Sequence, residues 1–130
     1  MNVLYNFNGS VESDLDSVKT FLKTVLEKLN FYIDDEDSFF DIKLILNELV
    51  VNGVIHGNKE NSEKKVFLDV TLDDKGIIIN VRDEGKGIDY DVSSYKVEDM
   101  KCSGRGLVLV EALSDNLILR NNEIIAVKYL

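Results

Sequence analysis

The sequence predicts an α+β protein in two layers, with a mixed, mainly antiparallel sheet and helices on one face of that sheet. Helical and strand patterns do not alternate strictly along the chain, which disfavours a doubly wound parallel sheet. The chain has 130 residues, of which 45% are hydrophobic, and this size suits a single compact domain over residues 1–130. It contains no proline, so neither of the two long helical segments is interrupted.

The first part of the chain is expected to form a strand and two helices. Apolar residues alternate with mostly polar ones over residues 3–7, which predicts a strand ending at Asn8-Gly9. A helix capped by Ser10 or Ser13 should follow, because apolar residues then recur at three- and four-residue steps. These residues are Leu15, Val18, Phe21, Leu22, Val25, Leu26 and Leu29. The acidic residues at 34–37 favour the start of a second helix. Its core-facing stripe is Phe39, Ile42, Ile45, Leu46 and Leu49.

The middle of the chain is predicted to form a loop and two strands. Residues 58–65 are polar and indicate a loop, and the alternation over 66–72 predicts a strand with one face toward solvent. The stretch 73–76 is typical of a turn. A β-branched run at 77–81 predicts a central strand that leads directly to Asp83.

The last part is expected to contain a lid, a short helix and a hairpin. No convincing period occurs over residues 90–102, and we expect a mobile lid at about 90–105. Residues 106–114 are predicted to form a short helix with three apolar side chains inward. Strands at 117–119 and 124–129 should close the chain as a hairpin, with Asn121-Asn122 at its turn.

Composition excludes several classes of function. Fifteen basic and twenty-four acidic residues give a net charge of −9, so we expect no direct nucleic-acid partner. The single cysteine, Cys102, and the single histidine, His56, exclude an internal disulfide and the usual zinc clusters. No apolar run approaches the ~20 residues of a membrane span, and the N-terminus lacks the pattern of a signal peptide. We therefore expect a cytoplasmic protein that does not enter a membrane.

Three short segments carry the functional signal. The first, at 48–56, places Glu48 and Asn52 four residues apart on the predicted second helix. The second, at 83–88, begins with Asp83 and contains two glycines, and the third, at 103–107, also contains two glycines. Each of these patterns alone is weak evidence, but three of them in this order within 130 residues are a strong signal.

Together these segments resemble the GHKL ATPase fold, shared by gyrase, the ninety-kilodalton heat-shock chaperone, sensor histidine kinases and mismatch-repair ATPases. The short length, the absence of an appended domain and the N-terminal pattern look most like the anti-sigma-factor serine kinases of bacterial partner-switching systems. The resemblance extends from about residue 3 to residue 130. It implies the same two-layer fold, ATP and Mg²⁺ as cofactors, and a homodimer. It also implies a kinase that binds a sigma factor and phosphorylates an anti-sigma-factor antagonist on serine.

Glu48 and Asn52 are the residues expected to carry out the chemistry. The amide oxygen of Asn52 suits a magnesium ion on a triphosphate, because that ion prefers hard oxygen ligands and keeps several waters. Glu48 is a candidate catalytic base that accepts the proton of a water or a serine hydroxyl during phosphoryl transfer. In the resembled family the matching positions hold these two roles. An exposed glutamate and an ordinary helix asparagine remain the alternative.

The two glycine segments are expected to hold the nucleotide. The carboxylate of Asp83 suits a hydrogen bond from the exocyclic amine of adenine, which guanine lacks at that position. Glycines let the backbone bend close to the base, and backbone N–H groups at the start of a helix favour phosphate oxygens. The residues expected to bind the nucleotide are Asn52, Asp83, Gly85, Gly87, Ile88, Ser103, Gly104, Arg105, Gly106 and Leu107. Ordinary turns are the alternative for each segment.

Some residues depart from the family pattern or stay outside the predicted chemistry. Lys101-Cys102 stands where the family often has an arginine before the second glycine segment, at 103–107. Asn121-Asn122-Glu123 lies where the family commonly has Gly-Thr near the start of the last strand. These departures put partner choice and nucleotide affinity in question. We expect His56 to be structural and Cys102 to be an ordinary lid residue. The alternative functions are a non-catalytic GHKL-fold regulator that binds a partner and a separated histidine-kinase catalytic domain.

Overall fold

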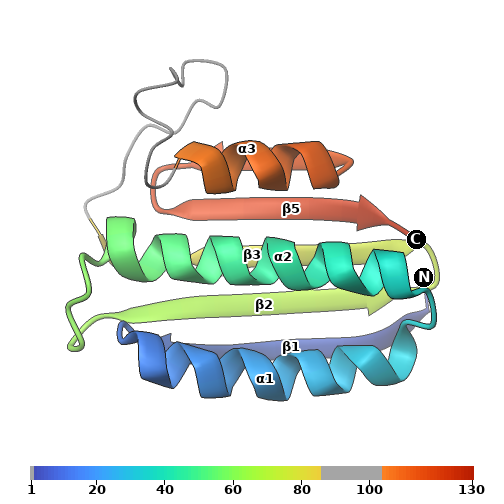
Figure 1. Ribbon diagram of the computed structural model, residues 1–130, viewed down its shortest axis with the longest axis horizontal. Coiled ribbons are helices and arrows are strands. Elements are labelled where there is room, and N and C mark those ends of the chain that lie inside the picture. The colour runs from blue at the N-terminus through green and yellow to red at the C-terminus, as the bar shows by residue number, and fades with distance from the viewer. Residues whose placement is uncertain (1, 86–103) are drawn as a thin grey trace.

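The computed structural model describes residues 2–85 and 104–130, and for residues 104–106 it describes the backbone alone. Within these residues, five strands form one sheet and three α-helices cover one of its faces (Figure 1). The helices are α1 (Leu15–Tyr32), α2 (Glu36–Asn52) and α3 (Gly104–Leu113). The predicted α+β architecture in two layers is confirmed.

The sheet has the strand order β1-β2-β3-β5-β4. Its strands are β1 (Val3–Glu12), β2 (Lys65–Asp73), β3 (Gly76–Arg82), β4 (Asn116–Arg120) and β5 (Glu123–Tyr129). All four neighbouring pairs are antiparallel, so the predicted mainly antiparallel sheet contains no parallel pair within the described residues. β3 lies at the centre of the sheet, as its β-branched sequence predicts.

The first strand is longer than the sequence indicates. β1 pairs with β2 from Val3, opposite Asp73, to Glu12, opposite Lys65, so the predicted end at Asn8-Gly9 is wrong. A glycine is tolerated here because β1 is an edge strand and its backbone keeps its partner across the ladder. Pairing with β2 therefore overrides the local turn signal.

Both long helices begin at aspartate caps. The carboxylate of Asp14 accepts hydrogen bonds from the backbone N–H groups of Asp16, at 3.0 Å, and Ser17, at 3.4 Å, whereas the predicted caps Ser10 and Ser13 do not cap α1. Ser10 lies within β1, and Ser13 is buried with its hydroxyl donating to the carbonyl of Lys64 at 2.8 Å. At α2, Asp35 accepts the backbone N–H of Ser38 at 3.0 Å, consistent with the acidic start that the sequence predicts.

The hydrophobic core fills the space between the helices and the sheet. The predicted stripe of α2 supplies its centre, with four residues of that stripe fully buried: Ile42, Ile45, Leu46 and Leu49. Leu107 and Val110 of α3 are also buried. Within the described residues, no helix is both long and apolar enough to cross a membrane. The core thus fixes α2 against the central strands, and α2 is the helix that carries Glu48 and Asn52 (Figure 1).

Candidate functional site

The second helix ends in a widened turn. α2 continues into the π-helical segment η1 (Gly53–Gly57), and the N–H of Asn58 donates to the carbonyl of Gly53 at 2.8 Å. Such single π turns are frequent at functional sites. A Cβ atom at Gly53 would lie 3.2 Å from a methyl carbon of Val66, so the absent side chain lets η1 approach β2 closely. The turn therefore brings the residues after Asn52 to the end of the sheet.

Glu48 and Asn52 both lie in the last part of α2, four residues apart, which places them on the same face of the helix. The side chain of Glu48 is half-buried. Asn52 is only 7% exposed although its side chain is polar. The pair combines a carboxylate that solvent or a ligand can reach with an amide held in a sheltered position.

Asp83 immediately follows β3 and is buried, with 6% of its surface exposed. Its Oδ1 atom accepts a hydrogen bond from the backbone N–H of Gly85 at 2.8 Å. Burial raises the pKa of the Asp83 carboxyl above its ordinary value, while the hydrogen bond from Gly85 and the charge of Lys64 act in the opposite direction. A carboxylate offers about four acceptor positions, so the bond from Gly85 leaves capacity for a donor on a ligand.

Two glycines, Gly57 and Gly85, allow η1 to contact the residues that follow β3, Asp83 to Gly85. A Cβ atom at Gly57 would overlap Oδ2 of Asp83 and lie 2.7 Å from Oδ1. A Cβ atom at Gly85 would overlap the carbonyl oxygen of Gly57 and lie 3.0 Å from Oδ1 of Asp83. Sequence reasoning selected Gly85 but missed Gly57, although Gly57 directly follows His56 at the end of the first motif.

Asn58 is a second residue that sequence reasoning missed. Its side chain is buried, and its Nδ2 atom donates to the hydroxyl of Ser13 at 2.8 Å and to the carbonyl of Lys65 at 2.9 Å. Its Oδ1 atom accepts the backbone N–H of Glu84 at 2.8 Å. Asn58 thus ties the end of η1 to the residue directly after Asp83. The sequence gives no local signal for this role, because the partners are distant in the chain.

Asn122, in the turn between β4 and β5, holds the other side of Asp83. The backbone N–H of Asp83 donates to the carbonyl of Asn122 at 2.9 Å, and Nδ2 of Asn122 donates to the carbonyl of Asp83 at 2.6 Å. The sequence marked this position as a hairpin turn and as a departure from the family pattern, but gave no sign of its contact with Asp83. Asp83 is therefore fixed both by η1 and by the β4–β5 turn.

The second glycine segment leads into α3. Gly104 is its first residue and Gly106 lies in its first turn, so the helix begins two residues before the predicted start at Gly106. Backbone N–H groups in the first turn of a helix favour anions such as phosphate. Leu107 is 1% exposed and belongs to the hydrophobic core, so its side chain is not accessible to a ligand.

Several of the predicted site residues lie outside the described part of the chain. They are Gly87, Ile88 and Ser103, together with Cys102 and most of the predicted lid. The side chain of Arg105 also lies outside the description.

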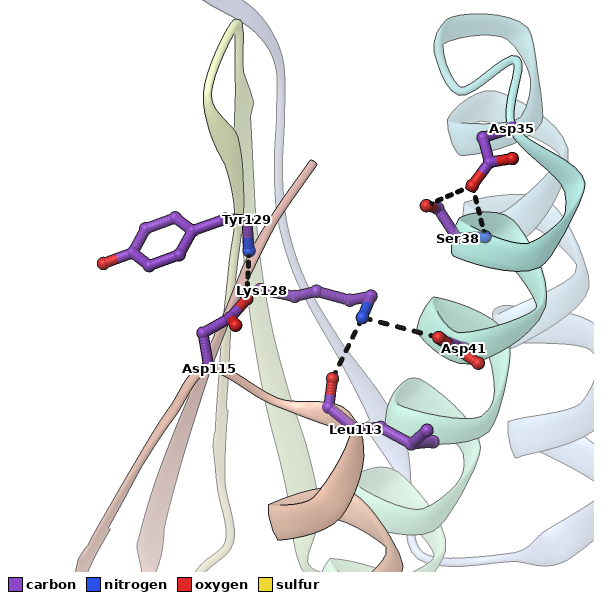
Figure 2. A network of polar contacts seen from close by, with 7 residues as sticks. All are labelled: Asp35, Ser38, Asp41, Leu113, Asp115, Lys128 and Tyr129. Carbon is purple, nitrogen blue, oxygen red and sulfur yellow. Dashed lines mark hydrogen bonds and ion pairs between the residues drawn. The ribbon is translucent and has the colours of Figure 1, made fainter.

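Lys128 anchors the ends of α2 and α3 that lie away from the candidate residues. Its ammonium group extends from β5, donates to the carbonyl of Leu113 at 3.0 Å and lies 3.4 Å from Oδ2 of Asp41 (Figure 2). Leu113 is the last residue of α3, and Asp41 lies in the first half of α2. The lysine side chain is only 16% exposed. This contact joins the helix that begins at Gly104 to the helix that carries Glu48 and Asn52.

Comparison with known families identifies the domain. Residues 11–128 match the family model of the histidine kinase-like ATPase domain. The chain belongs to this family. The resemblance inferred from the three motifs is confirmed, and membership of a family of ATPase domains implies binding of ATP.

Curated relatives of this histidine kinase-like ATPase domain are named as anti-sigma F factors. The protein from Bacillus subtilis (strain 168) is 35% identical over 86 residues, covering 62% of this chain and 59% of the relative. The protein from Bacillus velezensis is 33% identical over 88 residues, covering 64% and 60%, and the protein from Priestia megaterium is 35% identical over 88 residues, covering 62% and 59%. The chain thus covers about three fifths of the length of these relatives.

Proposed function

We propose that this domain is an ATP-dependent serine-protein kinase that also acts as an anti-sigma factor. It binds a sigma factor in one state and phosphorylates an anti-sigma-factor antagonist on serine in another. The observation that carries the proposal is the junction at which η1, directly after Asn52, packs on the buried carboxylate of Asp83. The name of the relatives, anti-sigma F factor, supports the sigma-factor part.

The junction suits an adenine nucleotide. The Asp83 carboxylate accepts a hydrogen bond from the exocyclic amine of adenine, whereas guanine presents a carbonyl oxygen there and is repelled. Gly57 and Gly85 let the backbone lie close to the carboxylate. The N–H groups of the first turn of α3 bind phosphate oxygens. The nucleotide therefore extends from the end of β3 toward the start of α3.

Asn52 suits a magnesium ion carried by the nucleotide. Its amide oxygen is a hard, neutral group that would hold the ion without adding negative charge to the phosphate site. Its burial at the end of α2 keeps the amide in one place. Bound magnesium neutralises charge on the phosphate oxygens.

Glu48 acts as the base in phosphoryl transfer. The serine hydroxyl oxygen forms a bond to the γ-phosphorus, and the bond from that phosphorus to the bridging oxygen of ADP breaks. The hydroxyl proton goes to the carboxylate of Glu48, and ADP leaves with the electron pair. The half-buried position of Glu48, one turn before Asn52, is compatible with access by a protein substrate.

The role of Glu48 is tested by Glu48→Gln, which keeps the shape of the side chain and removes the base. We expect transfer to the antagonist to fall at least about a hundredfold, since general bases contribute about 10²–10⁴. ADP affinity should stay within about twofold of wild type. The measurements are phosphoserine on the antagonist by mass spectrometry and ADP binding by calorimetry. Transfer at the wild-type rate would rule out Glu48 as the base.

The role of Asn52 is tested by comparing Asn52→Ala with Asn47→Ala, an exposed asparagine on the same helix. Nucleotide binding by Asn52→Ala should no longer strengthen when magnesium is added, while Asn47→Ala keeps the full effect of magnesium. Circular dichroism establishes that both variants are folded. An undiminished magnesium effect in Asn52→Ala would exclude the amide as a ligand.

The same experiments separate the other functions. Phosphohistidine on a partner, in place of phosphoserine, would indicate a separated histidine-kinase catalytic domain. Stable capture of a sigma factor by Glu48→Gln, with no phosphoprotein formed by the wild type, would indicate a non-catalytic regulator.

We also propose a homodimer, which the family resemblance supports. Sedimentation equilibrium should give twice the 14.7 kDa of one chain at micromolar concentration. A single species at the mass of one chain would reject the dimer.

A further inference from the structure

We infer that Asn122 is a positioning residue that sets the purine specificity of the nucleotide site by fixing the backbone of Asp83. The inference rests on the proposed function, because it requires Asp83 to be the group that recognises the base. Asn122 is not one of the residues selected from the motifs, and it comes from the opposite end of the sequence. Its effect is transmitted through two hydrogen bonds to Asp83.

The first observation is that both polar groups of the Asp83 backbone are held by the same residue. β3 and β5 pair up to Arg82, opposite Glu123, and the N–H of Asp83 continues this pairing by donating to the carbonyl of Asn122 at 2.9 Å. The Nδ2 atom of Asn122 then donates to the carbonyl of Asp83 at 2.6 Å. An ordinary ladder supplies only backbone bonds, so this side-chain bond is an additional constraint at the point where the strand ends.

The β4–β5 turn provides the geometry for this contact. Arg120 and Glu123 are paired, which leaves Asn121 and Asn122 as a two-residue turn. Asn121 has a φ of 34°, a conformation that asparagine tolerates better than most other residues. The short turn places Asn122 directly opposite Asp83. The two asparagines therefore have different tasks, since Asn121 makes the turn and Asn122 holds Asp83.

The position of the Asp83 backbone matters because the carboxylate has little freedom to move back if the backbone shifts. Oδ1 of Asp83 is already bonded to the N–H of Gly85, and Oδ2 lies where a side chain at residue 57 would be. A hydrogen bond to the amine of adenine weakens steeply when its distance or angle changes. A shift of the Asp83 backbone should thus weaken binding of adenine nucleotides selectively, while contacts to the phosphates persist.

The test measures the affinities of ADP and GDP by calorimetry for wild type, Asn122→Ala and the control Asn121→Gly. We expect Asn122→Ala to bind ADP about tenfold more weakly and GDP with unchanged affinity, since one hydrogen bond corresponds to about that factor. Asn121→Gly keeps the wild-type preference, because glycine accepts a positive φ. Asn122→Asp, nearly the same size but unable to donate, is the second variant if Asn122→Ala does not fold.

A double-mutant cycle separates positioning from a purely structural role. In an Asp83→Ala background, Asn122→Ala should cause no further loss of ADP affinity, because the acceptor that it positions is absent. Equal losses for ADP and GDP, or an unchanged ratio of the two affinities, would overturn the inference and leave the proposed function standing. A wild-type protein that binds neither nucleotide would overturn both.

Discussion

At the scale of single residues, the site depends on how closely the backbone of η1 can approach a carboxylate. Gly57 is needed for space and not for an unusual φ, because its Cβ atom would overlap Oδ2 of Asp83. Asp83 in turn is a buried acid whose surroundings include glycines and backbone amides. Desolvation makes such a carboxylate costly to ionise, so we expect the ionised Asp83 to favour a ligand that donates a hydrogen bond to it.

The need for space at residue 57 is tested by Gly57→Ala. The added methyl group must displace the Asp83 carboxylate, so we expect ADP affinity to fall about tenfold or more, and overpacking to cost about 1–3 kcal/mol of stability. Calorimetry and urea unfolding measure the two effects. His56→Ala, in the same turn, is the control and should bind ADP as the wild type does if His56 is structural. Unchanged ADP affinity in Gly57→Ala would show that the carboxylate takes no part in binding.

The raised pKa of Asp83 predicts a pH-dependent effect on stability. A folded-state pKa above the unfolded value means that the pH-dependent penalty is absent while the carboxyl is protonated in both states, and that stability falls as pH rises from the unfolded pKa through the folded pKa. Asp83→Asn does not ionise, so its free energy of unfolding relative to wild type should increase from about pH 3 to about pH 7. Urea unfolding at the two pH values measures this difference. A difference that is constant with pH would contradict the raised pKa.

At the scale of secondary-structure elements, the two helices with candidate residues are held at their far ends. Lys128 joins the last carbonyl of α3 to Asp41 on α2 (Figure 2). Both Glu48–Asn52 and Gly104 lie at the opposite ends of these helices. A fixed point at one end limits how far the start of α3 can move from α2. The sequence pattern does not suggest this anchor, because Lys128 lies within β5 and its partners are distant in the chain.

Replacing this lysine tests the anchor. Lys128→Met retains the apolar stem and removes the charge, and we expect a loss of about 1–2 kcal/mol in the free energy of unfolding, as for a partly shielded charged hydrogen bond. Hydrogen exchange should become faster in α3. The control is Arg120→Ala, which removes the long 3.9 Å contact of the exposed Arg120 with Glu123 and should change stability by less than about 0.5 kcal/mol. Equal losses in the free energy of unfolding for Lys128→Met and Arg120→Ala would show that Lys128 contributes no more than a surface charge.

At the scale of the whole molecule, the fold brings three distant parts of the chain to one end of the sheet. The end of α2, the end of β3 and the β4–β5 turn meet around Asp83. A ligand bound at this junction contacts the native state only, so its binding energy must add to the stability of the whole domain.

This coupling predicts stabilisation by nucleotide. At a free ADP concentration of about 100 times Kd, the free energy of unfolding should rise by about 2.7 kcal/mol, and at the same concentration GDP should raise it less. Asp83→Ala should lose most of the ADP effect while remaining folded. Urea unfolding with each nucleotide measures these changes. A midpoint of urea unfolding that stays the same at saturating ADP would argue against a nucleotide site in this domain.

The sequence by itself determined the architecture and the identities of the main candidate residues. Apolar periodicity predicted the helices, because each residue's burial follows from its place in a regular element, and the β-branched run at 77–81 predicted the central strand. The local motifs also selected Glu48, Asn52 and Asp83 for the chemistry of their side chains and Gly85 for its lack of one, and neither property depends on distant partners.

Only the tertiary structure decided which residues support Asp83. Gly57, Asn58 and Asn122 act through contacts with residues 26, 26 and 39 positions away, respectively, and no local pattern encodes such contacts. For the same reason β1 continues past Gly9, since its length is set by pairing with β2. Local propensity specifies what a segment can form, but the free energy of long-range contacts determines where it ends and what it touches.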